Sequence, residues 1–181
     1  MPIKIEVPET DLWSEREECF IKCKATTLVL EHSLVSVKKW EQKWHKPFLL
    51  KEAKTPEMMF DYIKFMTITQ NVDENVYYCI PEKEFKRITE YIEDSMTATT
   101  FSDDGKKSRN TEIMTNEVIY YYMFANQIPK ECEKWHLNSL MTLLRVFSAK
   151  NEPAKKEDPK TLAKRYASLN AQRRKALHSR G

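Results

Sequence analysis

Apolar and polar positions alternate in short runs along the first thirty residues. Residues 3–7 and 19–23 repeat with a period of two, and residues 27–30 form a further apolar, β-branched run. This period is typical of strands with one buried face. The pattern predicts an N-terminal β-hairpin or three-stranded sheet within residues 1–31. So small a sheet must pack on another part of the protein, because isolated strand pairs are marginally stable.

From residue 33 onward the apolar positions recur every three or four residues, which indicates amphipathic helices. Ser33 is a candidate N-cap for a first helix that must end by Pro47. Thr55 is a capping residue, and Pro56 after it suits the first turn of a helix. Together they predict the start of a second helix. The inward positions of the two helices are Leu34, Val37, Trp40 and Trp44, and then Met59, Ile63 and Met66.

Three further helices are predicted in the middle of the chain. The first is amphipathic and spans 85–92. The second starts at Thr115 or Asn116, and its run 118–124 is apolar on nearly all sides, so we expect it to be the most buried helix. Pro129 separates it from a long helix that runs through Lys150. The apolar positions of that long helix are Trp135, Leu140, Leu143, Leu144 and Phe147.

These elements predict a mainly α (α+β) fold in which the small β element packs on a bundle of about five helices. We expect one globular domain over residues 1–150, with the β element at about 1–31 and the helical body at about 33–150. Residues 151–181 are predicted to be a basic linker followed by an amphipathic tail helix.

The composition excludes several classes of active site. The chain has 181 residues but only two glycines, Gly105 and Gly181. Phosphate-binding loops, dinucleotide fingerprints and nucleophile elbows all need glycines where the backbone turns sharply or approaches a ligand. We therefore expect no enzymatic activity and no cofactor.

The start of the chain and its cysteines indicate the compartment in which it acts. The first residues do not form a signal peptide, and no apolar run is long enough to span a membrane. Four cysteines are too few for a disulfide scaffold and suit a reducing cytosol. The sequence thus predicts a cytoplasmic protein with no membrane partner.

Cysteine and histidine side chains are the candidate metal ligands and catalytic groups of the sequence. The pairs Cys19/Cys23 and Cys132/His136 each have three intervening residues, and the sequence leaves open whether the four side chains come together. They lie in apolar, regular segments, where cysteine is commonly a small hydrophobic residue. Glu31-His32 and the run 135–138 loosely resemble pieces of an endonuclease site, but His136 is better interpreted as a satisfied, partly buried histidine. We expect no metal site.

The distribution of charge is the strongest functional signal in the sequence. From Lys150 onward the sequence has ten Lys and Arg and three acidic residues, a net charge of +7. This leaves a net charge of −4 for residues 1–149. A basic amphipathic helix of this length is barely stable until it docks on a partner. The predicted partner-binding residues of this tail are Lys164, Arg165, Tyr166, Leu169, Arg173, Arg174 and Lys175.

An acidic protein is a better candidate partner for this tail than nucleic acid. Tyr166 is the only aromatic residue among the positive charges, and phosphate contacts alone carry no specificity. The acidic body itself is a candidate, within the chain or across a homo-oligomer.

Four stretches carry a resemblance to a known family. They are LVLEHSLVSVKKWEQKWHKPFL at 28–49, MTATT at 96–100, NEVIYYYMFANQIPKECEKWHLNSLMTLLRVFSAKN at 116–151 and LNAQRRK at 169–175. Together they resemble a family of small proteins from long-tailed bacteriophages, found mostly in phages of Gram-positive hosts. The chain differs from the family pattern at Tyr122, Ser139 and Phe147, where tryptophan, arginine and a small residue are expected.

The resemblance implies a place among the virion assembly proteins, and specifically the work of a tail assembly chaperone. Such proteins bind the tape-measure protein, keep it soluble and recruit tail-tube subunits in the host cytoplasm. Side chains that can cover apolar seams of a tape measure are Met58, Met59, Met66, Met114, Trp40 and Trp44, although core packing is the simpler interpretation of each. The alternatives are a structural component of the virion (tail, neck or head) and a nucleic-acid-binding protein that acts through its basic tail.

Overall fold

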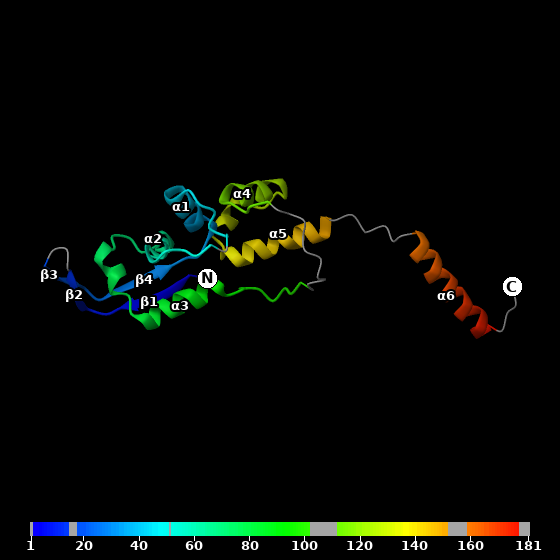
Figure 1. Ribbon diagram of the computed structural model, residues 1–181, viewed down its shortest axis with the longest axis horizontal. Helices are drawn as coiled ribbons and strands as arrows, with labels where there is room; N and C mark the ends of the chain where they lie inside the picture. Colours follow the sequence, from blue (N-terminus) through cyan, green and yellow to red (C-terminus); the bar gives the residue numbers. More distant parts are fainter. Residues whose placement is uncertain (1, 15–17, 51, 102–111, 152–158, 178–181) are drawn as a thin grey trace. The chain divides into compact units, whose positions relative to one another are not determined.

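Figure 1 shows the computed structural model of the protein. The structure describes residues 2–14, 18–50, 52–101, 112–151 and 159–177. The chain divides into two compact units, Met1–Phe147 and Ser148–Gly181. We call them the body and the tail, and describe each by itself.

The body begins with two stretches of antiparallel strand pairing. β1 (Ile3–Val7) pairs with β4 (Thr26–Leu30), and β2 (Thr10–Ser14) pairs with β3 (Cys19–Cys23). Val7 faces Thr26 and Thr10 faces Cys23, so one register continues across the break after Val7. The predicted hairpin is confirmed and the three-stranded alternative is wrong. β2 was not predicted because its sequence, TDLWS, resembles a polar loop.

A disulfide joins Cys23 in β3 to Cys79 in η1 (Glu74–Cys79). The two residues are 56 positions apart and both are buried. The expectation that the cysteines act only as small hydrophobic residues is therefore wrong for this pair. It holds for Cys132, which is buried and unpaired.

The first two helices begin and end where their capping residues predict. α1 (Leu34–Trp44) has Ser33 as its N-cap and ends at His45, whose φ of 51° is left-handed. α2 (Pro56–Met66) has Thr55 as its N-cap, whose Oγ1 accepts from the Met58 N–H at 3.3 Å. The inward face of α2 includes Met58, Ile63 and Met66. Met59, which was expected inside, is only partly buried because it lies one position away from that face.

The helices cover the β1–β4 pair on different sides (Figure 1). α3 (Glu82–Glu93) contacts β1, and α1 packs on α2. The chain that leaves α2 bonds to the free edge of β4, through Ile68 N–H to Val29 O at 2.9 Å and Glu31 N–H to Met66 O at 2.8 Å. The β element thus gains the support that its size requires.

Two predictions for the second half of the body are wrong. α4 (Asn116–Ala125) is not the most buried helix, since only Asn116, Ile119 and Met123 are buried. Trp135 does not lie in a helix that runs through Lys150: it follows the 3-10 helix η2 (Lys130–Lys134), precedes α5 (Leu137–Asn151), and is 48% exposed. The chain bends there because His136 pairs with Ser33 as an isolated β-bridge.

The core of the body joins its sheet to its helices. Its largest fully buried side chains are Trp40, Tyr62, Ile5, Leu28, Leu30, Leu34, Ile63, Met66, Ile88, Ile119, Met123 and Leu137. The protein is mainly α with a small N-terminal β element, as predicted. Loop 102–110 and linker 152–158 lie outside the described residues.

The tail contains α6 (Pro159–Leu177). None of the helices in the described ranges has the length and apolar character needed to cross a membrane.

Candidate functional site

The partner-binding residues predicted from the sequence all lie in α6, and all are exposed. Tyr166 and Leu169 are 58% and 40% exposed, although both are large and apolar. Tyr166, Leu169 and Arg173 lie on one face at steps of three and four residues. The helix contains six Lys and Arg and no acidic residue. The side chain of Leu162 lies outside the described part of the chain.

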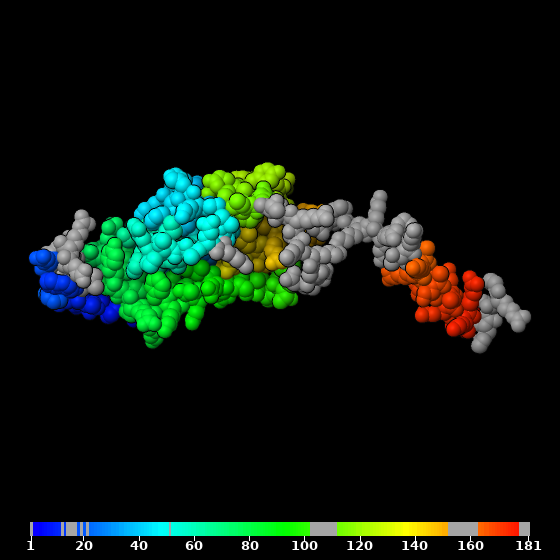
Figure 2. All heavy atoms as spheres, viewed as in Figure 1, coloured from blue at the N-terminus to red at the C-terminus, as the bar shows by residue number. Residues whose placement is uncertain are grey.

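A second exposed apolar surface lies on α4 and was missed in the sequence. Tyr121 is 67% exposed and Phe124 is 61% exposed, and Glu117 precedes them on the same face. We call Glu117, Tyr121 and Phe124 the α4 stripe. In Figure 2 the atoms of α4 (yellow-green) form part of the outer surface of the body. The signal was present in the sequence, because a helix that is apolar all round but packs on one side must expose aromatic residues on the other.

Acidic side chains flank the α4 stripe. The Tyr120 hydroxyl donates to Glu133 Oε2 and the Tyr122 hydroxyl donates to Glu112 Oε2, each at 2.8 Å. The pKa of Glu117 is lowered because its own backbone N–H, in the first turn of α4, stabilises the carboxylate. Lys38 is the cation recorded beside these aromatic rings, 5.7 Å from the centre of the Tyr120 ring.

The strand pair β2–β3 carries a third exposed apolar surface, formed by an aromatic pair. Trp13 faces Phe20 across the pair, and their rings meet edge to face at 4.9 Å. Both side chains are exposed. Together with the α4 stripe they give the body two aromatic surfaces of the kind that protein partners cover.

The two histidines that resemble pieces of an endonuclease site come together in the core. The rings of His32 and His136 meet with their centres 4.9 Å apart, and both residues are buried. His32 Nδ1 lies 2.5 Å from the Tyr62 hydroxyl. His136 Nδ1 accepts from the Asn138 N–H at 3.3 Å, so its Nε2–H donates to Tyr91 O at 2.9 Å.

The surroundings of these histidines favour their neutral forms. Burial, followed by the neighbouring His136, lowers the pKa of His32 to about 3, and burial also lowers the pKa of His136. Leu137 N–H donates to His32 O at 2.9 Å, so the same residues join the start of α1 to the start of α5. This arrangement supports a structural role, in agreement with the interpretation of His136 as a satisfied histidine.

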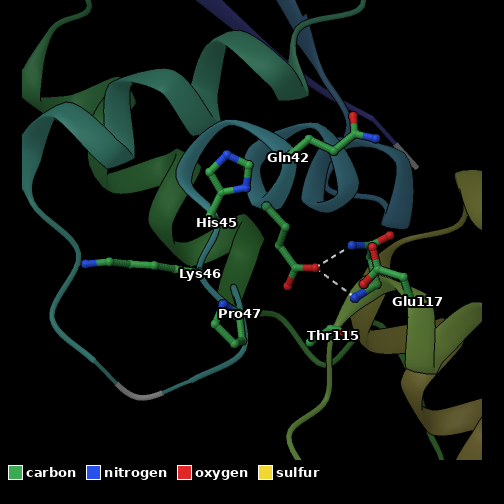
Figure 3. Close-up of a pocket in the computed structure, with 8 residues that line it drawn as sticks. Gln42, His45, Lys46, Pro47, Thr115 and Glu117 are labelled. Carbon is green, nitrogen blue, oxygen red and sulfur yellow. Dashed lines mark hydrogen bonds between the residues drawn. The ribbon is translucent and has the colours of Figure 1, made fainter.

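An open hollow of about 410 Å³ between α1 and α4 is the pocket shown in Figure 3. Glu41, which is buried, is one of the residues that line it. Glu41 Oε1 accepts from the Phe48 N–H at 2.7 Å, and Oε2 accepts from the backbone N–H and side-chain amide of Asn116 at 2.8 and 2.6 Å. Glu41 therefore already supplies the negative charge that the N-terminus of α4 attracts, and the hollow offers no anion site.

The four candidate metal ligands do not form a cluster in the described part of the chain. Cys23 is bonded to Cys79, and Cys132 is buried in η2. The side chain of Cys19 lies outside the described part. Among the residues whose side chains are described, no group of three or more His, Cys, Asp or Glu could hold a metal ion.

Comparisons with known proteins give no assignment: no protein-family model, curated protein or solved structure matches the chain.

Proposed function

We propose that the protein is a non-enzymatic morphogenesis protein of a long-tailed bacteriophage and acts as a tail assembly chaperone. In this role the body binds the tape-measure protein and the tail recruits tail-tube subunits. The proposal rests on the family resemblance of the sequence and on the surfaces that the folded chain offers to other proteins.

The exposure of α6 is the observation that carries the proposal. Every side chain described from 163 to 177 is exposed, and these include Tyr166 and Leu169 beside Arg173. A single helix of this length gains little stability from its own hydrogen bonds and gains more by docking. Its basic, partly apolar surface suits an acidic protein groove.

The aromatic surfaces of the body suit the other half of the proposed role. A tape-measure protein is a long helical chain with apolar seams, and exposed tyrosine, tryptophan and phenylalanine side chains bind such seams with little loss of conformational entropy. Tyr121 and Phe124 on α4, and Trp13 and Phe20 on β2–β3, are the side chains available for it. Met58, Met66 and Trp40, which the sequence offered for the same task, are buried and are less suitable.

Co-expression with the tape-measure protein of the same phage tests this function. We expect the full chain to keep the tape measure soluble and to co-purify with it. The double variant Tyr121→Ser/Phe124→Ser should lose most of that complex, because it removes exposed apolar area without disturbing the core. A matched control is Glu90→Ser/Glu93→Ser on the exposed side of α3, which should behave like the unmodified chain.

An insoluble tape measure and no co-purification would contradict the proposal. Abundant peptides of this chain in purified mature virions would favour a structural virion component instead. DNA binding that falls steeply with salt and depends on Arg173 and Arg174 would favour the nucleic-acid alternative.

The proposed location is the host cytoplasm. The disulfide between Cys23 and Cys79 is the observation that weighs against it, because disulfides are rare in a reducing cytosol. Trapping the thiols with an alkylating reagent in infected cells, followed by mass spectrometry, decides the matter. Alkylated Cys23 and Cys79 support the cytoplasmic location, and an intact disulfide contradicts it.

A further inference from the structure

The α4 stripe has a carboxylate, Glu117, at its N-terminal end and the aromatic rings of Tyr121 and Phe124 toward its C-terminal end. Glu117, Tyr121 and Phe124 stand at relative positions 0, 4 and 7 of the helix, and span about 10 Å. Tyr121 and Phe124 are among the most exposed large apolar side chains of the described residues. Exposed aromatic rings next to a carboxylate form a surface that a basic amphipathic helix can cover.

α6 carries the complementary stripe in the reverse order. Tyr166, Leu169 and Arg173 lie on one face, and counted backward from Arg173 they stand at relative positions 0, 4 and 7. When the two helices run antiparallel, Arg173 faces Glu117, Leu169 faces Tyr121 and Tyr166 faces Phe124. The spacing matches residue for residue over the same length of about 10 Å.

We propose that α6 docks antiparallel on the α4 stripe of a second copy of this chain, so that two copies exchange their tail helices.

The charges beyond the stripes support this alignment. An antiparallel α6 brings Arg174 and Lys175 toward the end of α4 where Glu112 lies. The C-terminal end of α6 then lies beside the N-terminal end of α4, and the two helix dipoles attract each other. Two described cations lie near this surface, Lys38 beside Tyr120 and Glu117 and Lys46 in the hollow that Glu117 also lines, against the carboxylates of Glu112, Glu117 and Glu133. The local balance is negative, and α6 is entirely basic in its charged residues.

We assign the partner that covers the α4 stripe to a second copy of this chain, because an exchange of tail helices makes the same contact twice. Each copy gives its α6 and receives the α6 of its partner, which closes a two-fold pair and doubles the buried area. Both apolar stripes, exposed in the single chain, are then covered, so the exchanged pair must open before α6 or the α4 stripe binds a phage partner. The inference goes beyond the proposed function, and its test needs no phage partner, so failure of one does not imply failure of the other.

Sedimentation equilibrium of the full chain at low salt tests the exchange. We expect the weight-average mass to rise from 21.5 kDa toward twice that value as concentration increases. Two charge-reversed variants separate the two surfaces: Glu112→Lys/Glu117→Lys on the body and Arg173→Glu/Arg174→Glu on the tail. Each alone should weaken association at least about tenfold, since like charges then face each other. The mixture of the two variants should associate again, because the basic stripe of one meets the acidic helix of the other.

Matched controls use exposed residues away from both stripes. Glu90→Lys/Glu93→Lys on α3 and Ser168→Glu/Gln172→Glu on another face of α6 should leave the association as it is. Circular dichroism verifies that all variants keep the same helix content. A full chain that stays monomeric up to about 1 mM would overturn the inference, as would a dimer that both reversals leave unchanged. If the mixed variants fail to associate, the pairing of these two stripes is wrong.

Discussion

Glu41 shows how one buried side chain can hold two separate segments of the chain. Its carboxylate accepts from the backbone of Phe48 after α1 and from the backbone and side chain of Asn116 at the start of α4. These segments are 68 residues apart in sequence. A carboxylate with three donors is well suited to the N-terminus of a helix.

Replacing Glu41 should therefore destabilise the body. We expect Glu41→Ala to lower the free energy of unfolding by about 2–3 kcal/mol, because it leaves buried N–H donors without an acceptor. Urea denaturation measures this loss. The neighbouring, exposed Gln42→Ala is the control and should change stability by less than about 0.5 kcal/mol. Equal effects of the two substitutions would contradict the role of Glu41.

The histidines at the start of α1 and before α5 make stability depend on pH. The pKa of His32 is about 3 in the folded chain and near 6.5 when unfolded, so between these values the unfolded chain binds a proton that the folded chain does not. Stability is therefore complete above pH 6.5 and falls as the pH decreases toward 3. The lowered pKa of His136 acts in the same direction.

From His32 alone we expect the free energy of unfolding to fall by about 2 kcal/mol between pH 6.5 and pH 5. Denaturant titrations at several pH values measure the slope. His32→Gln should flatten it, whatever its effect on stability at neutral pH. The control is His45→Asn at an exposed position, where asparagine tolerates the left-handed backbone. This variant should keep the original slope. A His32→Gln variant with the slope of the unmodified protein would refute this account.

At the scale of elements, α5 and the segment before it illustrate what periodicity can and cannot predict. Leu140 and Leu144 are buried as their spacing predicts, since α5 is a regular helix. Trp135 shares that spacing but lies outside the helix and is half exposed. The bridge of His136 to Ser33 breaks the helix, and that contact joins residues about a hundred positions apart.

Alanine substitution should separate these two residues. Leu140→Ala is expected to cost about 2–5 kcal/mol, as for other fully buried leucines. Trp135→Ala should cost less, about 1 kcal/mol, because much of the ring is already in contact with water. Thermal unfolding of both variants is the measurement, and a larger loss for Trp135→Ala would contradict the half-exposed environment of its ring.

At the scale of the whole molecule, the body and the tail differ in how they are stabilised. The body has a core that joins its sheet to its helices, whereas the described side chains of α6 from 163 to 177 are all exposed. Burial of apolar area is the main favourable contribution to folding. The body should then fold without help from α6.

We expect a chain that ends at residue 151 to keep the thermal midpoint of the full chain within a few degrees. Both proteins must be compared at a concentration at which the full chain is monomeric, since self-association shifts the midpoint. The matched control is the full chain with Ser168→Ala, an exposed change in α6. Unfolding of the shortened body would mean that α6 belongs to its core.

The sequence by itself determined the kinds of element and where most of them begin. Ser33, Thr55 and Thr115 cap helices as predicted, and the β-hairpin at the N-terminus forms, because capping and periodicity act over a few residues. The predicted partner-binding residues of the tail are also exposed on one helix.

Only the tertiary structure decided which apolar faces are covered and which polar side chains meet. Tyr121 and Phe124 have the same local pattern as core residues, yet they face outward because α4 packs on one side only. The pairing of His32 with His136, of Glu41 with Asn116 and of Cys23 with Cys79 joins residues 56 to 104 positions apart. Such contacts depend on how the elements pack, and a local pattern carries no information about distant partners.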